Sequence, residues 1–248
     1  MFSFFSSKPL LREILPSNYI DIHNHILPGI DDGAPTVEDS EILISGMKEL
    51  GINKSIATPH TFFGRWENTA QTIKAAFDFH AEQTKDTSFV QNYASEYMLD
   101  SRLIERAQNE SLLCLKDNYL LVELNLFTCP IDLYELLFEL KIKGYRIIIA
   151  HPERYIYFHN SIEKFEKLKA FGVDFQMNLL SLTGYYSKSI LKCTQLLLDH
   201  DLYDFTGTDI HHTKHIEYLN EKPLVYSSKS SLVKLLENNS LFAKVAII

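Results

Sequence analysis

Two histidines separated by one residue, His23 and His25, are the first side chains of this sequence whose types and spacing suit metal binding. They lie in an apolar run that predicts a short strand, and residues two apart in a strand point to the same side. The segments Pro28-Gly29 and Asp31-Asp32-Gly33 predict sharp turns just after it. Two imidazoles on one face, followed by loop carboxylates, indicate a metal site, although an isolated His-x-His is usually an ordinary polar pair.

Further histidines and carboxylates occur where other predicted strands end. Apolar patterns predict strands over residues 19–25, 52–57, 88–95, 119–123, 145–150, 173–177 and 202–206. Six of these strands end in, or close to, residues that can bind metal: His23 and His25, His60, Glu96, Glu123, His151, and Asp209 with His211. A single residue of this kind is usually structural, but chance does not readily account for six strand ends. The sequence therefore predicts a shared metal centre.

Helical patterns alternate with these strands and cover about residues 36–50, 69–85, 99–108, 130–141, 161–171, 187–200 and 228–237. Alternation of this kind predicts a parallel sheet with helical crossovers, the α/β class. About seven units in one domain favour a closed barrel, whose active site assembles at the carboxyl ends of its strands. The sequence contains no Gly-x-Gly-x-x-Gly or P-loop motif that would favour an open sheet.

The composition fits one domain. The chain has 248 residues, 46% of them hydrophobic, and we expect a single barrel domain over 1–248 with an apolar N-terminal arm over 1–18. No apolar run approaches the roughly 20 residues that span a bilayer, so membrane insertion is not expected. A net charge of −8 argues against nucleic acid as a partner. Three cysteines without close pairing indicate a cytoplasmic location, and the oligomeric state stays open.

Together, these motifs resemble the PHP (polymerase and histidinol phosphatase) superfamily. The run from Asp21 to Gly33 and the motif His151-Pro152-Glu153-Arg154-Tyr155 are most similar to the bacterial tyrosine-protein phosphatases of capsular and exopolysaccharide synthesis. The resemblance extends from about Asp21 to His211. It implies a distorted (β/α)7 TIM-like barrel of PHP type and a metal-dependent protein-tyrosine phosphatase. The implied substrate is phosphotyrosine in protein, on a bacterial tyrosine autokinase that controls polysaccharide synthesis or export.

The resemblance also implies up to three divalent metal ions. The implied ligands form three sets: His23, His25, Glu96 and Asp209; Glu96 again, as a bridge, with Glu123 and His151; and Asp32, His60 and His211. Asp31 could replace Asp32, and Asp21 is either a partner of a ligand imidazole or a structural residue. Clustered cations neutralise a phosphomonoester dianion and activate water. Mixed histidine and carboxylate ligands suit Mn, Fe or Zn and do not decide among them.

Three basic residues are expected to act on the phosphate: Arg154, Arg65 and Lys214. Arg154 has the planar fork that pairs with phosphate oxygens. The resemblance implies an arginine shortly after the Asp209-x-His211 motif, which this sequence lacks. Either Lys214 or His215 is its substitute, or both are solvated loop residues. Arg65 and Trp66 lie in a predicted loop, where the indole either stacks on a tyrosine ring or is half-buried.

Other functions have different signatures. A cysteine-dependent phosphatase needs Cys-x5-Arg, but Leu120, Glu135 and Asp199 stand six residues after the three cysteines. A small-molecule phosphomonoesterase, such as a histidinol phosphatase, would have a deep pocket with an additional carboxylate, whereas an open site favours a protein substrate. The remaining alternative is a metal-stabilised module without turnover.

Overall fold

The computed structural model describes residues 8–84, 86–159, 161–226 and 228–243. Residues 1–7 of the predicted arm and the C-terminal residues 244–248 lie outside these ranges. The described part of the arm contains the short 3-10 helix η1 (Leu11–Glu13), and its Leu11 side chain is fully buried. None of the described helices is long and apolar enough to cross a bilayer. The single domain over 1–248 stays a prediction.

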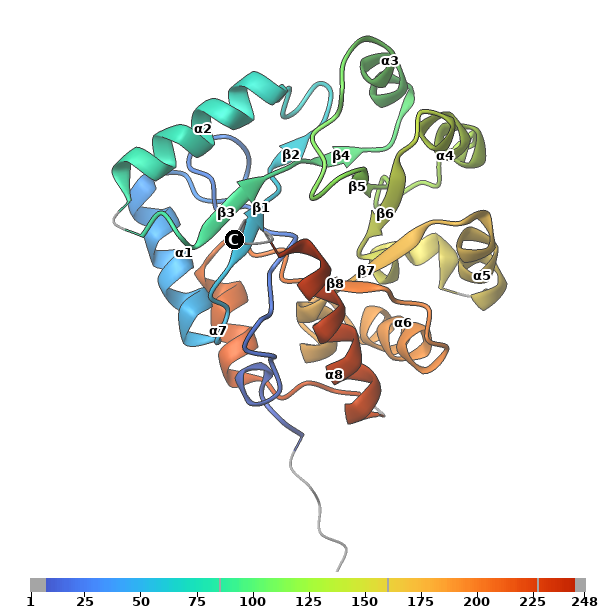
Figure 1. The fold of residues 1–248 in the computed structure, drawn as a ribbon. Helices are drawn as coiled ribbons and strands as arrows, with labels where there is room; N and C mark the ends of the chain where they lie inside the picture. The colour runs from blue at the N-terminus through green and yellow to red at the C-terminus, as the bar shows by residue number, and fades with distance from the viewer. Residues whose placement is uncertain (1–7, 85, 160, 227, 244–248) are drawn as a thin grey trace, which may run out of the picture.

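Short parallel strands form the inner wall of the molecule (Figure 1). Their bounds are β1 Ser55–Ala57, β2 His60–Thr61, β3 Val90–Tyr93, β4 Glu96–Met98, β5 Tyr119–Glu123, β6 Arg146–Ala150, β7 Asp174–Asn178 and β8 Phe205–Gly207. A curled sheet has the order β2-β4-β5-β6-β7-β8, and β1 pairs with β3 beside it. Helices surround the strands, as strand–helix alternation predicts. The predicted α/β barrel is confirmed.

An extended segment, residues 21–24, closes the ring between β8 and β1. Asp21 pairs with Ser55 of β1, and Asn24 pairs with Ile210 beyond β8, each through an isolated parallel bridge. The prediction of a regular strand over 19–25 is therefore wrong. Side chains replace part of the backbone ladder, because the Thr58 hydroxyl and the Asp21 carboxylate accept hydrogen bonds from main-chain N–H groups of this segment.

The second and third positions of the barrel each contain two strand pieces. β1 gives way to β2 at His60, and β3 gives way to β4 at Glu96. The break includes Pro59, which has no N–H to donate, and its carbonyl accepts bonds from the Glu96 N–H and the Ser95 hydroxyl. His60 and Glu96 therefore begin new strand pieces, which corrects the prediction that they follow completed strands.

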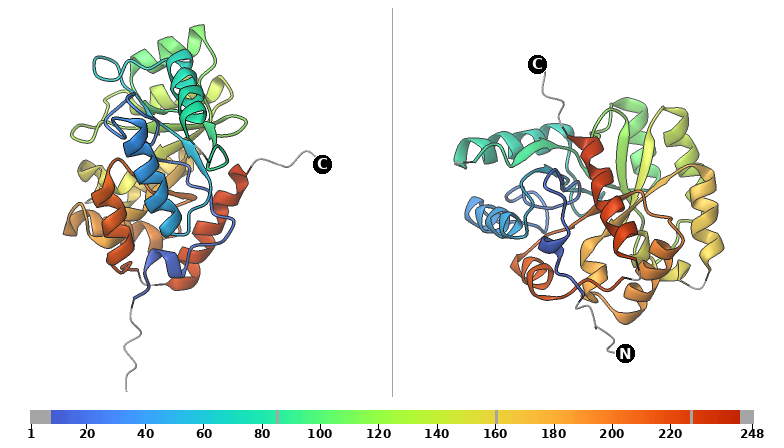
Figure 2. Two further views of the ribbon diagram at one scale, coloured as in Figure 1. Left: turned by 90° about the vertical axis from the view of Figure 1, so that its left-hand side faces the viewer. Right: turned by 60° about the horizontal axis from the view of Figure 1, so that its bottom comes forward.

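The described α-helices lie outside the strands (Figures 1 and 2). They are α1 Val37–Glu49, α2 Ala70–Gln83, α3 Ser101–Asn109, α4 Leu133–Ile142, α5 Ile162–Phe171, α6 Lys188–Asp199, α7 Thr213–Glu221 and α8 Lys229–Asn238. Thr36 caps α1 by accepting a bond from the Asp39 N–H. Two predictions need correction: α4 begins three residues after Pro130, and α7 occupies a region expected to be a loop.

Apolar side chains fill the barrel below the carboxyl ends of its strands. The inner core includes Ile22, Leu121 and Ile148, all at most 1% exposed. Phe242 of the 3-10 helix η5 (Asn239–Phe242) packs edge-on against Tyr119 and Phe205, the first residues of β5 and β8, with ring centroids 5.4 and 5.0 Å away. The 3-10 helix η5 thus covers the amino end of the barrel, and the predicted metal ligands lie at the opposite end.

Candidate metal centre

All nine predicted metal ligands converge at the carboxyl end of the barrel. Four overlapping groups have candidate ligand atoms within 4.8 Å of one another: His25, Asp32, His60 and His211; His23, His25 and Asp209; His23, Glu96 and His151; and His60, Glu96 and Glu123. Backbone conformation contributes to this convergence, because His151 and Asp209 have positive φ angles of 33° and 52°. A positive φ angle is a strained backbone conformation for a residue other than glycine, and such strain is typical of functional sites.

Glu96 lies at the centre of the deep part of the cluster and is fully buried. Its Oε2 atom is 3.1 Å from His23 Nε2 and 3.0 Å from His60 Nδ1. Its Oε1 atom is 3.1 Å from His151 Nε2. The two oxygens therefore face different imidazoles, the arrangement expected of a carboxylate that bridges two ions. The contact with His60 differs from the predicted sets, which placed His60 only with Asp32 and His211.

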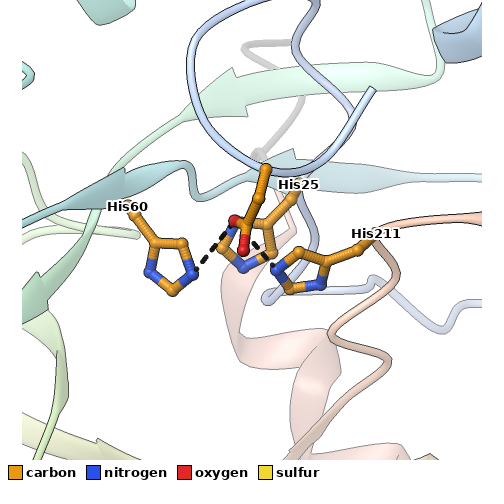
Figure 3. A group of neighbouring side chains, drawn as sticks. His25, His60 and His211 are labelled. Atoms are coloured by element: carbon orange, nitrogen blue, oxygen red, sulfur yellow. Dashed lines mark ion pairs between the residues drawn. The ribbon is translucent and has the colours of Figure 1, made fainter. Parts of the chain in front are cut away.

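The outer part of the cluster surrounds the carboxylate of Asp32. Figure 3 shows the rings of His25, His60 and His211 facing one another, and its dashed lines are the ion pairs from Asp32 Oδ1 to His60 Nε2 at 3.6 Å and to His211 Nε2 at 3.5 Å. Asp31 points elsewhere: its Oδ2 atom contacts His25 Nδ1 at 2.7 Å and accepts a bond from the His60 N–H. The structure thus places Asp32 among the ligand candidates and Asp31 behind them.

Glycines at two positions allow this close approach. A Cβ atom on Gly33 would lie 1.8 Å from the His25 carbonyl oxygen, and one on Gly207 would lie 2.6 Å from the His23 Cβ. Both distances are far below van der Waals contact, so a side chain at either position would displace a histidine of the centre. The glycine of the Asp-Asp-Gly turn is therefore part of how the ligands are positioned.

The residue that orients His23 was not predicted. Gln176, on β7, has its Oε1 atom 2.7 Å from His23 Nδ1, which leaves Nε2 to face the cluster. Asp21 does not contact an imidazole; it accepts bonds from the N–H and hydroxyl of Thr208 and is structural. Neutral amides inside a buried strand have no sequence signature of metal chemistry, so only their proximity to the ligands reveals Gln176.

A second unpredicted amide holds Asp209. Asn178, the last residue of β7, donates from Nδ2 to Asp209 Oδ2 at 2.9 Å. Arg154 donates from Nη1 to the same oxygen at 2.8 Å, and its guanidinium stacks on Tyr186 at 4.6 Å. Asp209 Oδ1 faces the imidazoles of His23 and His25, each at 3.4 Å. One oxygen is thus fixed by donors while the other faces the metal cluster.

Replacing Asn178 with alanine is expected to weaken metal binding and lower turnover by about tenfold, because partners behind a ligand contribute roughly 10–100-fold to affinity or activity. Metal titration and kcat/KM on the same preparation measure both effects. The matched control is Asn220→Ala, which removes an amide of α7 that bonds only to exposed Arg12 among its recorded contacts. Wild-type metal affinity in Asn178→Ala would contradict the positioning role.

The three predicted phosphate-binding residues have different positions. Arg154 and Arg65 line the pocket above the cluster. Of the two alternatives for Trp66, the structure shows the half-buried indole: its ring stacks on His60 at 4.6 Å and lies 4.1 Å from the Arg65 guanidinium. Lys214 is exposed in the first turn of α7 and is not among the residues that line this pocket. The structure therefore does not bring Lys214 to the site.

Mutual charge stabilisation dominates the buried part of the cluster. Burial opposes ionisation of Glu96, but His23 and His60 hold the pKa of this carboxyl well below its ordinary value. Burial likewise opposes protonation of His23, yet Glu96 and Asp209 raise its pKa to about 9. Glu123 behaves differently: burial and the neighbouring Glu96 charge raise its pKa to about 7. The cluster without metal therefore holds protons that bound cations would displace.

Several buried atoms support a fit to metal ions. His23 Nε2, His25 Nε2 and Glu96 Oε2 face the cluster and are buried without a hydrogen-bond partner among the described residues. They lie within ion-pair distance of their neighbours but do not meet hydrogen-bond geometry. Buried polar atoms normally have partners, and imidazole and carboxylate are the ligand types of Mn, Fe and Zn. The donor set present fits divalent cations.

A parallel α/β barrel with buried histidines and carboxylates at the carboxyl ends of its strands defines a barrel hydrolase with a candidate metal centre. The chain belongs to the capsular polysaccharide synthesis family CpsB/CapC, which matches residues 19–231. This range contains all nine predicted ligands. The resemblance inferred from the motifs is confirmed.

Relatives of known description agree with this family. The chain is 29% identical to the tyrosine-protein phosphatase YwqE of Bacillus subtilis over 237 residues, 90% of this chain and 93% of that protein. It is 27% identical to the tyrosine-protein phosphatase CpsB of Streptococcus pneumoniae over 202 residues, 77% and 82% of the two chains. These descriptions agree with the enzyme class expected from the sequence.

Solved structures that resemble this chain include a tyrosine phosphatase and a barrel protein. A crystal structure from work on YwqE and CpsB, described as unique metal-dependent tyrosine phosphatases, matches with a TM-score of 0.73 and 28% identity, over 88% of this chain and 94% of that chain. A phosphotriesterase homology protein from Escherichia coli matches with a TM-score of 0.52 and 15% identity, over 92% and 99%. The second likeness shows the barrel fold alone.

Proposed function

We propose that this chain is a metal-dependent protein-tyrosine phosphatase whose metal ions are held by the nine residues of the centre. The observation that carries the proposal is their convergence beneath one pocket, with Arg154 in the same wall. The relatives support the reaction class, and the unpartnered buried atoms support the ligand roles. A module without turnover is not favoured, because it would have no need for an arginine and an open pocket above the ligands.

Each part of the site has a proposed task. Bound divalent ions would neutralise the phosphate dianion and activate the attacking water. Burial opposes the charge of Arg154, but Tyr186 and Asp209 raise its pKa, so it stays cationic. Asp209 engages one of its nitrogens, and within the described part of the chain the remaining N–H groups of the fork have no hydrogen-bond acceptor, so they can bind a phosphate oxygen. Arg65, at the mouth, contacts the phosphate or acidic residues beside it.

The pocket favours a protein substrate over a small molecule. Its volume is about 170 Å³, below the roughly 300–1,000 Å³ of pockets that enclose whole ligands. Its lining carboxylates, Asp32, Glu123 and Asp209, all belong to the proposed ligand set, so none is left to bind an amino group such as that of histidinol phosphate. A phosphotyrosine side chain can enter such a site while the polypeptide stays outside.

The proposed physiological substrate is phosphotyrosine on a bacterial tyrosine autokinase that controls polysaccharide synthesis or export. The family description, capsular polysaccharide synthesis, supports this partner class. A cytoplasmic location is proposed with it, supported by three cysteines that all carry free thiols, Cys114, Cys129 and Cys193.

Purified protein should hydrolyse a phosphotyrosyl peptide, lose the activity on treatment with a chelator, and regain it with Mn. Phosphate release from the peptide, from its phosphoserine counterpart and from histidinol phosphate would be compared. We expect the phosphotyrosyl peptide to be preferred by at least about tenfold in kcat/KM. Activity that survives complete metal removal would contradict the metal-dependent reaction, and preference for histidinol phosphate would contradict the substrate class.

A further inference from the structure

Unusually exposed apolar side chains occur in two of the loops that follow strands at the carboxyl end of the barrel, and one of them, Phe127, lines the metal pocket. Among the described large apolar residues, the two most exposed are Ile131 at 104% and Phe127 at 82%, both between β5 and α4. Phe63, between β2 and α2, is 58% exposed. Single exposed apolar residues are common, but clusters of them beside a pocket typically mark a binding surface. We call Phe63, Phe127 and Ile131 the apolar rim.

Hydrogen bonds hold the segment that carries Phe127 in one conformation. The Asn125 side-chain oxygen accepts bonds from the N–H groups of Phe127 and Thr128, at 2.9 and 3.0 Å. The Tyr157 hydroxyl donates to the Asn125 carbonyl at 2.8 Å. Exposure of Phe127 therefore results from a structured turn that points its ring away from the core.

The opposite loop is also structured. The main-chain N–H groups of Arg65 and Trp66 both donate to the Phe62 carbonyl, and Phe62 donates in return to the Trp66 carbonyl. Gly64 takes the left-handed conformation that this tight turn requires, with φ of 78°. Phe63 is consequently held at the tip of the loop, with the Arg102 guanidinium 4.7 Å from its ring.

Two hollows adjoin the metal pocket and share a lining residue with it. Met98 lines the metal pocket, a neighbouring hollow of about 290 Å³ and a further hollow of about 440 Å³. Phe127 lines the metal pocket, and Phe63 lines the hollow of about 440 Å³. Pro130 and Asp132, the residues on either side of Ile131, line the hollow of about 290 Å³. When a substrate polypeptide places one side chain in the metal pocket, the residues on either side of that side chain therefore lie along these hollows.

We propose that the apolar rim binds apolar side chains on either side of the phosphotyrosine in an extended polypeptide substrate. The inference rests on the proposed phosphatase function and adds the kind of sequence that the site prefers. In an extended chain, residues two apart face the same side and lie about 7 Å from each other. The positions two residues before and after the phosphotyrosine therefore face the surface that the phosphotyrosine enters, and leucine there buries area against the rim.

The test compares two phosphotyrosyl peptides that differ only in having leucine or serine at both of these positions. Wild-type protein should prefer the leucine peptide by about tenfold in kcat/KM. The variant Phe63→Ser/Ile131→Ser should lose most of this preference. Neither residue lines the metal pocket, so turnover of para-nitrophenyl phosphate reports whether the metal centre is intact. Phe79→Ser, which replaces a half-exposed phenylalanine of α2, is the matched control and should keep the preference.

The outcomes separate the two proposals. No preference in the wild type, or a preference unchanged in the double variant, would overturn the rim proposal while phosphotyrosine hydrolysis still supports the function. The same loss in Phe79→Ser would also overturn it. If the double variant changes only self-association in sedimentation, the rim is an interface between copies and the proposal is wrong. Failure to hydrolyse either peptide would instead refute the phosphatase function.

Discussion

Replacing Glu96 with glutamine is expected to lower kcat/KM for a phosphotyrosyl peptide by about 10³-fold or more. The two oxygens of Glu96 face different imidazoles, with Oε2 3.1 Å from His23 and 3.0 Å from His60 and Oε1 3.1 Å from His151. Glu123 has the same arrangement at longer distances, 3.9 Å to His60 and 3.7 Å to His151. Glutamine keeps the shape but removes the charge that holds two cations together. Charge stabilisation by metal ions is worth several kcal/mol, and each 1.36 kcal/mol is about tenfold in rate.

The measurement is steady-state turnover together with a count of bound metal in the same preparation. We expect metal content to fall with activity, because the substitution acts through the ions. Glu166→Gln, at an exposed position of α5, is the matched control and should leave both values unchanged. A Glu96→Gln protein that retains all its metal and turns over within tenfold of wild type would refute the bridging role.

Replacing Arg154 with alanine is expected to lower kcat by about 10²–10³-fold, the usual effect of removing one donor that stabilises transition-state charge. Arg154→Lys should recover little, because an ammonium cannot reproduce the planar fork. Asp209 also loses its 2.8 Å partner in both variants, but Asn178 continues to hold the same oxygen. Metal content should therefore fall much less than the rate.

This difference distinguishes the two roles open to Arg154. If it binds phosphate, the fully metal-loaded variant stays slow, and its rate recovers little with added metal. If it only positions Asp209, activity should follow metal occupancy and return at high metal concentration, which would contradict the phosphate-binding role. Arg12→Ala, at an exposed arginine that does not line the metal pocket, is the control for loss of an arginine as such.

Much of the metal centre was predictable because ligand chemistry is local. Imidazole and carboxylate side chains are recognisable by type, and their recurrence after apolar segments places them at one end of a parallel barrel. Predictions of exact strand bounds were less successful. Residues 21–24 form only isolated bridges, and Pro59 interrupts the second barrel position, since side chains there replace backbone hydrogen bonds.

The sequence by itself determined the barrel class, the family resemblance and the nine candidate ligands, because these depend on residue types and on the period of apolar residues. Tertiary structure alone decided which atoms meet. Gln176 and Asn178 are neutral amides on one strand, and Arg154 reaches Asp209 across 55 positions of sequence. The exposure of Phe127 and Ile131 could not be predicted from the sequence either. An apolar residue in a loop is buried or exposed according to its packing partners, and only the folded chain supplies these.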